Sequence, residues 1–164
     1  MEGSREMKKM ILGLGIGLLV GALVMGFVMY KMAPGMMLLE DESKFGFEAT
    51  VEKLKQSVDK HGWKLPKVHD LQKTMAKFNV QVRPVQVFEL CHPDHAAKIL
   101  KEGDERIVSS MMPCRVAIYE KPNGKVYVSR MNTSLMAGMM GGLVAEVMDH
   151  ASAENEEILG AVLN

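Results

Sequence analysis

The sequence predicts an α+β protein, in which an antiparallel sheet has helices packed on one face and follows a single transmembrane helix. Three observations predict this class: an uncharged apolar run near the N-terminus, segments with apolar residues at helical spacing, and two alternating apolar segments joined by Asn123-Gly124. Asn-Gly is a preferred pair for the turn between antiparallel strands. Because helices and hairpins occupy separate parts of the chain, the helices are expected to cover one face of the sheet.

The N-terminal apolar run, MILGLGIGLLVGALVMGFVMY at 10–30, carries no charge. At about 1.5 Å per residue, a helix of this length spans the roughly 30 Å hydrocarbon core of a bilayer. We therefore expect a transmembrane helix at 10–32 and a linker at 33–43. A cleaved signal peptide is the alternative, but the run is longer than the usual apolar region of such peptides and no A-x-A cleavage site follows it.

The charges beside this run predict its orientation. Arg5, Lys8 and Lys9 precede it, and an acidic cluster follows it at 40–42. Because positive residues are retained on the inner side of a membrane, residues 1–9 are expected in the cytoplasm. The protein is then a single-pass protein of the cell membrane with an extracytoplasmic domain.

A glycine stripe lies within the expected membrane helix. Gly13, Gly17 and Gly21 recur every fourth residue and therefore share one helix face. Small residues on one face allow a second helix to approach closely, which favours a homo-oligomer or a membrane-protein partner. The alternative is chance, since glycine is common in membrane helices.

The domain at 44–164 is expected to begin with an amphipathic helix. Val51, Leu54 and Val58 have helical spacing, and Gly62 is a typical terminator. A shorter helix is expected after Asp70, which can act as its cap. Its apolar face contains Leu71, Met75 and Phe78.

Strands are expected in the middle of the domain. The alternating valines of 79–90 predict one strand, which Pro84 should make bulged or place at the sheet edge. The hairpin at 115–130 is the clearest unit. The remainder, at 133–163, is mostly helical by composition, with Gly141-Gly142 expected to bend or interrupt it.

The order of these elements resembles a known family. The most specific features are Cys91 with Pro93, and the triplet Pro113-Cys114-Arg115. Over about 45–163 the chain resembles the domain of unknown function family 302. The resemblance implies a compact α+β fold related to that of the TATA-binding protein, often dimeric, with no settled activity.

The segment ELCHPDHAAKIL contains the main candidate site. Proline favours the first position of a helix, so Pro93 predicts His92 as the cap, with Cys91 just before it. Unpaired N–H groups and the helix dipole at such a terminus stabilise a thiolate. Asp94 opposes this effect by adding a nearby negative charge.

Three interpretations of this site stay open. In the first, Cys91 and Cys114 are structural, as buried thiols or one disulfide. In the second, they perform thiol redox or sulfur chemistry, with Cys114 as the resolving partner. In the third, Cys91, His95 and Cys114, with Met111 or Met112, form a soft set suited to copper, or the site is linked to haem.

Other functions find less support. The chain has 20 Lys and Arg against 20 Asp and Glu, so it lacks the positive charge of a nucleic-acid-binding protein. Methionine is abundant, at 16 residues, and supplies flexible apolar volume. Arg115 is a candidate anion contact, and His92 a proton partner for Cys91. We expect a membrane-anchored binding or assembly module more than an enzyme; the alternative is a thiol-based redox or sulfur-handling protein.

Overall fold

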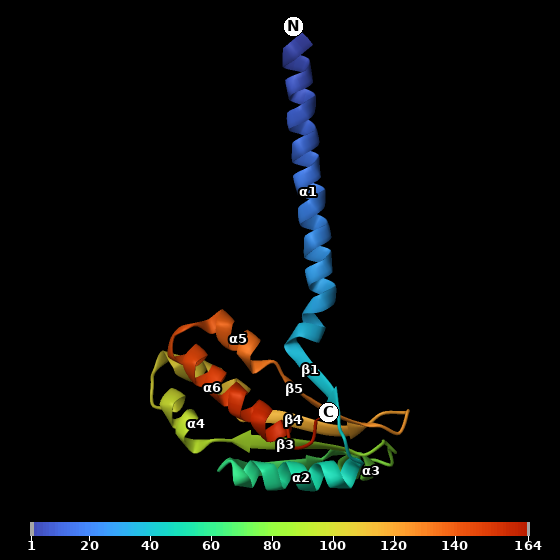
Figure 1. Ribbon diagram of the computed structural model, residues 1–164, viewed down its shortest axis with the longest axis vertical. Helices are drawn as coiled ribbons and strands as arrows, with labels where there is room; N and C mark the ends of the chain where they lie inside the picture. Colours follow the sequence, from blue (N-terminus) through green and yellow to red (C-terminus); the bar gives the residue numbers. More distant parts are fainter. Residues whose placement is uncertain (1, 164) are drawn as a thin grey trace. The chain divides into compact units, whose positions relative to one another are not determined.

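The computed structural model describes residues 2–163, shown as a ribbon in Figure 1. Two residues lie outside the described residues: Met1, the first residue of the expected cytoplasmic segment, and Asn164, the last residue of the expected domain. The chain divides into two compact units, Met1–Met36 and Met37–Asn164. Each unit is described by itself.

The helix α1 (Glu2–Met37) forms the first unit, and its last residue is the first residue of the second unit. It contains a 24-residue stretch, Met10–Ala33, with a mean hydropathy of 2.5 and no buried residue. Length and composition therefore suit a membrane span, and a signal sequence would satisfy the same two criteria. No neighbouring side chain lies where a Cβ would be placed at Gly13, Gly17 or Gly21. A helix partner at this stripe stays a prediction.

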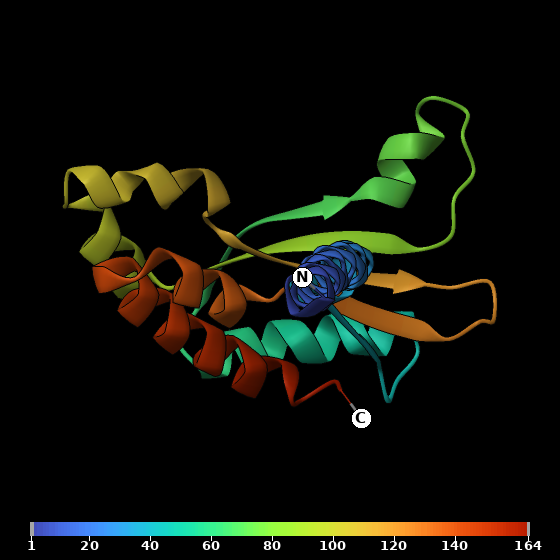
Figure 2. The same cartoon turned by 90° about the horizontal axis from the view of Figure 1, so that it is seen from above.

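The second unit is an α+β domain, as predicted. Antiparallel strands form a sheet in the order β1-β5-β4-β3-β2. Figure 2 shows α2 and α6 along one face of this sheet, with α4 and α5 near one of its ends. The elements are β1 (Leu38–Glu42), α2 (Phe47–Lys60), β2 (Lys64–Asp70), α3 (Leu71–Ala76), β3 (Val85–Cys91), α4 (Pro93–Leu100), the 3₁₀ helix η1 (Asp104–Met111), β4 (Cys114–Glu120), β5 (Val126–Met131), α5 (Thr133–Met140) and α6 (Gly142–Leu159).

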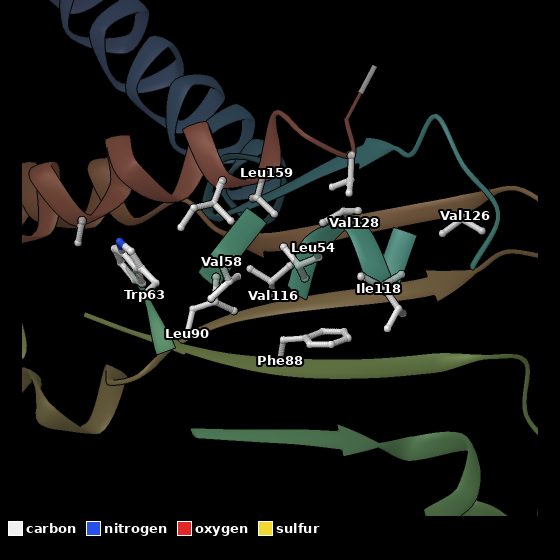
Figure 3. Close-up of a cluster of buried hydrophobic side chains, with 14 residues drawn as sticks. Leu54, Val58, Trp63, Phe88, Leu90, Val116, Ile118, Val126, Val128 and Leu159 are labelled. Carbon is white, nitrogen blue, oxygen red and sulfur yellow. The ribbon is translucent and has the colours of Figure 1, made fainter. Parts of the chain in front are cut away.

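The main core lies between the sheet and the two covering helices (Figure 3). Successive strand residues point to opposite faces, so alternate positions of β3, β4 and β5 are buried. These positions meet the apolar stripe of α2 and the last turn of α6. The buried residues include Phe88, Leu90, Val116, Ile118, Val126 and Val128 from the strands, and Leu54, Val58 and Leu159 from the helices.

A second, smaller apolar cluster lies at the end of the domain that contains α4 and η1. It is formed by Ile99, Val108, Val144 and Val147, with Met148 packed against it. These residues come from α4, η1 and α6. The long helix α6 therefore contributes to both clusters and joins the two parts of the core.

The prediction of a linker at 33–43 is wrong, because residues 33–42 belong to a helix and a strand. Helix α1 continues to Met37, and residues 38–42 form β1, an edge strand in register with β5. This strand lacks an alternating apolar pattern, which is why the sequence did not reveal it. Ion pairs hold its carboxylates instead: Glu40 pairs with Lys121, and Glu42 with Lys125 at 2.9 Å.

The strand expected at 79–90 also differs. Strand β3 begins only after Pro84, and it lies between β4 and β2 rather than at an edge. The edge position belongs to β2, which the sequence did not predict. Pro66 interrupts its pattern, and its register with β3 shifts between Lys64 and Lys67.

One local prediction is wrong: α3 ends at Ala76, so Phe78 lies beyond the helix and is 70% exposed instead of sharing its apolar face. The predictions of helix ends and caps are confirmed. Helix α2 is followed by Gly62 with φ +77°, and the Asp70 side chain accepts a hydrogen bond from the Lys73 backbone as the cap of α3. Gly141 and Gly142 have φ of +70° and +58° and separate α5 from α6. Left-handed angles of this kind favour glycine, so these residues end one helix and start the next.

The hairpin turn is longer than the tightest kind. Gly124, with φ +76°, donates its backbone N–H to the Lys121 carbonyl, and a further bond joins Lys121 to Lys125. A turn closed by a left-handed glycine in this way still matches the twist of the two strands. The prediction of a hairpin at Asn123-Gly124 is therefore confirmed.

Candidate functional site

A cavity of about 340 Å³ lies in the domain where the ends of β3, β4 and β5 meet α4, η1 and α6. Both apolar clusters contribute to its walls: Leu90 and Val116 come from the main core, and Ile99 and Val147 from the smaller one. The cavity is thus the space between two packed regions. Cavities of this volume, lined mainly by apolar residues with a few polar groups, are typical of small-molecule sites.

The structure brings the predicted site residues of the domain to this one cavity. Its lining includes Cys91, His92, His95, Met111, Met112, Cys114 and Arg115. They converge because β3 ends at Cys91 and β4 begins at Cys114, and the two strands are neighbours with Leu90 opposite Cys114. The intervening chain, with α4 and η1, returns over this end of the sheet. The glycine stripe belongs to α1, in the other unit.

Helix α4 begins as the sequence predicted. His92 is the cap residue, Pro93 occupies the first position and Asp94 lies in the first turn. His92 forms no side-chain capping bond to the helix. Its imidazole is therefore available to the cavity rather than used by the helix terminus.

Three aromatic rings gather at one side of the cavity. The ring centroids of His92 and His95 are 4.6 Å apart, and those of Trp63 and His92 are 5.7 Å apart in an edge-to-face arrangement. The Trp63 and His95 centroids are 6.0 Å apart. Contacts of this kind hold the rings in defined orientations.

A carboxylate from α6 fixes two of these rings. Trp63 Nε1 donates to Glu154 Oε2 at 2.7 Å, and His95 Nε2 lies 3.0 Å from Glu154 Oε1. Burial would raise the pKa of Glu154, but hydrogen bonds from Trp63 and His95 lower it below its ordinary value, and His95 and His92 lower it further when they are protonated. Glu154 is therefore ionised near neutral pH and acts only as an acceptor.

Buried polar atoms without a hydrogen-bond partner occur beside the cavity. Within residues 2–163, these side-chain atoms are His92 Nδ1, His95 Nδ1 and Asn155 Oδ1. All three side chains line the cavity. Buried polar groups are nearly always paired, so three in one place need an explanation. Sequence patterns missed Glu154 and Asn155 because they are polar residues of a helix about sixty positions away from His95.

The two cysteines are both free thiols, and both are partly buried. Burial raises the pKa of the Cys114 thiol; a hydrogen bond with Asn155 acts in the opposite direction, and the charge of Cys91 raises it further. The net shift is upward. Cys114 is therefore protonated near neutral pH, which is the state of a buried structural thiol rather than of a nucleophile.

The residues of the predicted soft-metal set line the same cavity, but their His and Cys members do not form a metal-binding group. Across the part of the chain that the structure describes, no group of three or more His, Cys, Asp or Glu side chains could hold a metal ion. The reason is local. Helix α4 begins at Pro93, so Cys91 belongs to β3 and does not share a helix face with His95. The prediction of copper or haem at Cys91, His95 and Cys114 thus has no ligand arrangement to support it.

Comparisons with known proteins agree on the family. The family described as "Domain of unknown function DUF302" matches residues 39–163. A crystal structure titled "uncharacterized conserved protein DUF302 from Bacillus stearothermophilus" is similar, with a TM-score of 0.68 and 20% identity. The match covers 77% of this chain and 98% of that one. Among curated proteins, no sequence matches. The chain therefore belongs to the DUF302 family, the resemblance that Cys91, Pro93 and the Pro113-Cys114-Arg115 triplet indicated.

Proposed function

We propose that this protein is a membrane-anchored binding domain whose cavity takes a small, largely apolar ligand. The observation that carries the proposal is the coincidence of an apolar cavity of about 340 Å³ with three unpartnered buried polar atoms. An apolar wall supplies affinity, and a few polar atoms orient the ligand. A ligand in the cavity gives these atoms the partners that they lack.

The anchor is α1, and the proposed location of the domain is extracytoplasmic. The apolar stretch Met10–Ala33 supports the anchor, and the basic residues before it support the orientation. A reporter enzyme that is active only outside the cytoplasm, fused after Asn164, is expected to be active. Activity of a cytoplasmic reporter at the same position, in an intact chain, would contradict the orientation.

Self-association through α1 is a further part of the proposal. Replacement of Gly17 and Gly21 with Leu is expected to reduce the oligomer size in detergent, because bulky side chains prevent close approach of two helices. The matched control replaces Gly15 and Gly26, which lie off the stripe, with Leu. An unchanged size in the Gly17/Gly21 variant would remove the argument for a helix partner.

The alternative function, thiol redox or sulfur chemistry at Cys91 and Cys114, has less support. The raised pKa of Cys114 disfavours its thiolate, which is the reactive form. The apolar cavity and its unpartnered atoms need no thiol reaction to explain them. The binding proposal therefore uses more of what this site contains.

Ligand binding can be tested with Trp63, the only tryptophan of the chain, which lines the cavity. The probe is 4-bromotoluene, whose bromine quenches indole fluorescence on contact, added to the full chain in lipid nanodiscs. Saturable quenching is expected, whereas partition into lipid gives a non-saturating background. Ser152→Leu fills the cavity and is expected to abolish the saturable part.

A neighbouring residue provides the matched control. Ala153 is exposed on α6 and does not line the cavity, so Ala153→Leu should quench as the unmodified protein does. Quenching that rises linearly and equally in all three proteins would show that the probe does not enter the cavity. The proposal would then be wrong for apolar ligands of this size.

A further inference from the structure

We propose that the cavity selects a ligand carrying a hydroxyl group, whose O–H donates to His95 Nδ1, and that Glu154 is the positioning residue that makes this nitrogen an acceptor. The inference rests on the proposed binding function and names the chemical class of the ligand. It follows from three side chains that line the cavity, Trp63, His95 and Asn155, and from Glu154, which is hydrogen-bonded to the first two.

The first step concerns the proton of His95. Both carboxylate oxygens of Glu154 are engaged, Oε2 by the Trp63 N–H and Oε1 by His95 Nε2. An ionised carboxylate can only accept, so His95 Nε2 carries a proton. A neutral imidazole has one proton, and His95 Nδ1 is then left with a lone pair. That nitrogen is buried and has no partner.

A second acceptor lies beside the same cavity. Asn155 Oδ1 is buried and has no hydrogen-bond partner, and its side chain lines the cavity. An amide oxygen can only accept a hydrogen bond, so this atom is an acceptor. Two acceptors without donors mean that a matching ligand must donate hydrogen bonds.

The charges of the side chains around the cavity favour a neutral ligand. A carboxylate or phosphate would meet lone pairs at His95 and Asn155 and the negative charge of Glu156 in the lining. Of the two arginines in the lining, Arg130 is already paired with Glu156 and Asp41, and the Arg115 side chain is 67% exposed to water. A cation would lose its hydration among apolar walls, while the carboxylate of Glu154 is already satisfied by Trp63 and His95. A hydroxyl group donates one hydrogen bond and carries no charge. The rings of Trp63 and His92 suit an aromatic body for the same molecule.

The domain contains a matched control for this arrangement. His69 Nε2 lies 2.9 Å from Glu89 Oε1, in a second histidine–glutamate pair on β2 and β3. Neither residue lines the cavity. The same substitution in this pair therefore changes a histidine–carboxylate contact without changing the proposed acceptor.

The experiment compares two probes that differ only in the donor: 4-propylphenol and its methyl ether. Binding to the full chain in lipid nanodiscs is measured by equilibrium dialysis at pH 8, with empty nanodiscs subtracted, and Trp63 fluorescence reports occupancy of the cavity. The phenol is expected to bind about tenfold more tightly than the ether, because the ether leaves a buried acceptor unpaired. Glu89→Gln is expected to keep this preference.

Glu154→Gln tests the positioning role. The amide oxygen of the new side chain can still accept from Trp63, and its NH₂ group then faces His95 Nε2. That nitrogen must become the acceptor, so the proton of a neutral His95 moves to Nδ1. The preference for the phenol is expected to disappear or to reverse in favour of the ether. If Glu154 had only a structural role, the substitution would weaken the binding of both probes equally.

The outcomes separate this inference from the proposed function. Saturable binding of both probes without preference in the unmodified protein, or a tenfold preference that persists in Glu154→Gln, would overturn the acceptor role and leave the binding function intact. Saturable binding of neither probe would overturn both. If Glu154→Gln does not fold, ¹⁵N NMR of the unmodified protein decides: a neutral His95 protonated at Nδ1 overturns the inference, and one protonated at Nε2 supports it.

Discussion

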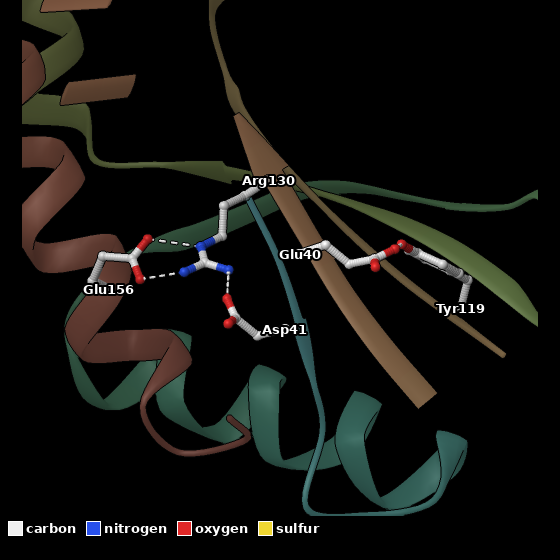
Figure 4. Close-up of polar contacts among 5 residues, drawn as sticks. All are labelled: Glu40, Asp41, Tyr119, Arg130 and Glu156. Atoms are coloured by element: carbon white, nitrogen blue, oxygen red, sulfur yellow. Dashed lines mark hydrogen bonds and ion pairs between the residues drawn. The ribbon is translucent and has the colours of Figure 1, made fainter. Parts of the chain in front are cut away.

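Replacement of Arg130 should destabilise the domain more than any other single exchange among its ion pairs. Figure 4 shows its guanidinium between two carboxylates. Arg130 Nε and Nη2 donate to the two oxygens of Glu156 at 2.7 and 2.6 Å, and Nη1 donates to Asp41 at 2.5 Å. These residues belong to β5, α6 and β1. One side chain thus joins the edge strand, its neighbour and the covering helix.

The exposure of the partners sets the size of the effect. The Arg130 side chain is only 10% exposed, whereas those of Asp41 and Glu156 are 50% and 43% exposed. After Arg130→Met both carboxylates can be hydrated, so the loss of about 3–5 kcal/mol for an isolated buried charge does not apply. The main effect is the loss of charge-assisted hydrogen bonds, and we expect the free energy of unfolding to fall by about 2 kcal/mol. Arg130→Lys keeps the charge but loses the bidentate contact with Glu156. Its free energy of unfolding should lie between those of the unmodified protein and Arg130→Met.

Urea unfolding of the full chain in detergent, followed by Trp63 fluorescence, measures the change. Lys125→Met is the control, because the exposed pair of Lys125 with Glu42 should contribute less than about 1 kcal/mol. An Arg130→Met variant with the same unfolding free energy as the control would refute the reasoning. It would mean that the packing of β1 and α6 on the sheet does not depend on this contact.

Three further predictions concern protonation. The lowered pKa of Glu154 means that its contribution to stability is present above about pH 4.5 and is lost as pH falls through its folded value, so the stability difference between the unmodified protein and Glu154→Gln should shrink on acidification. The Tyr119 hydroxyl should ionise near pH 12, because burial and its hydrogen bond to Glu40 raise its pKa to about 12; an ultraviolet titration should show an ionisation phase there, and Tyr119→Phe should remove it. In Cys91→Ser, native Cys114 should resist iodoacetamide at pH 7.5 and react after unfolding; rapid native labelling would contradict its raised pKa.

The predictable part of the fold is the part with a local cause. The apolar stripe of Val51, Leu54 and Val58 can be buried only as a helix face, and Gly124 closes the hairpin because it tolerates a left-handed angle. Strand β1 had no such signal. Three of its five residues are acidic, and it is held by partners about eighty positions away, such as Lys121 and Lys125. No local pattern encodes a pairing of that kind.

The candidate site likewise has features that the sequence predicts and features that it does not. Pro93 marked the start of α4, and the return of the chain from β3 to β4 explains why Cys91 and Cys114 reach one cavity. The chemistry of the cavity, however, depends on Glu154 and Asn155 of α6. Each lies on a helix with ordinary polar spacing, and only the packing of α6 against α4 brings them to His95. A sequence pattern cannot separate such residues from solvent-facing ones.

The position of the cavity links ligand binding to the packing of α4. The smaller apolar cluster holds α4 and η1 against α6 with few buried residues, among them Ile99 and Val147, while the main core fixes the sheet independently. The part of the domain with the smaller core is expected to open first. His95 belongs to α4 and Glu154 to α6, so the acceptor is assembled only while the two helices are packed together. A ligand bound to that acceptor adds its binding free energy to the packed state alone. Occupancy of the cavity should therefore stabilise the end of the domain that is least stable without it.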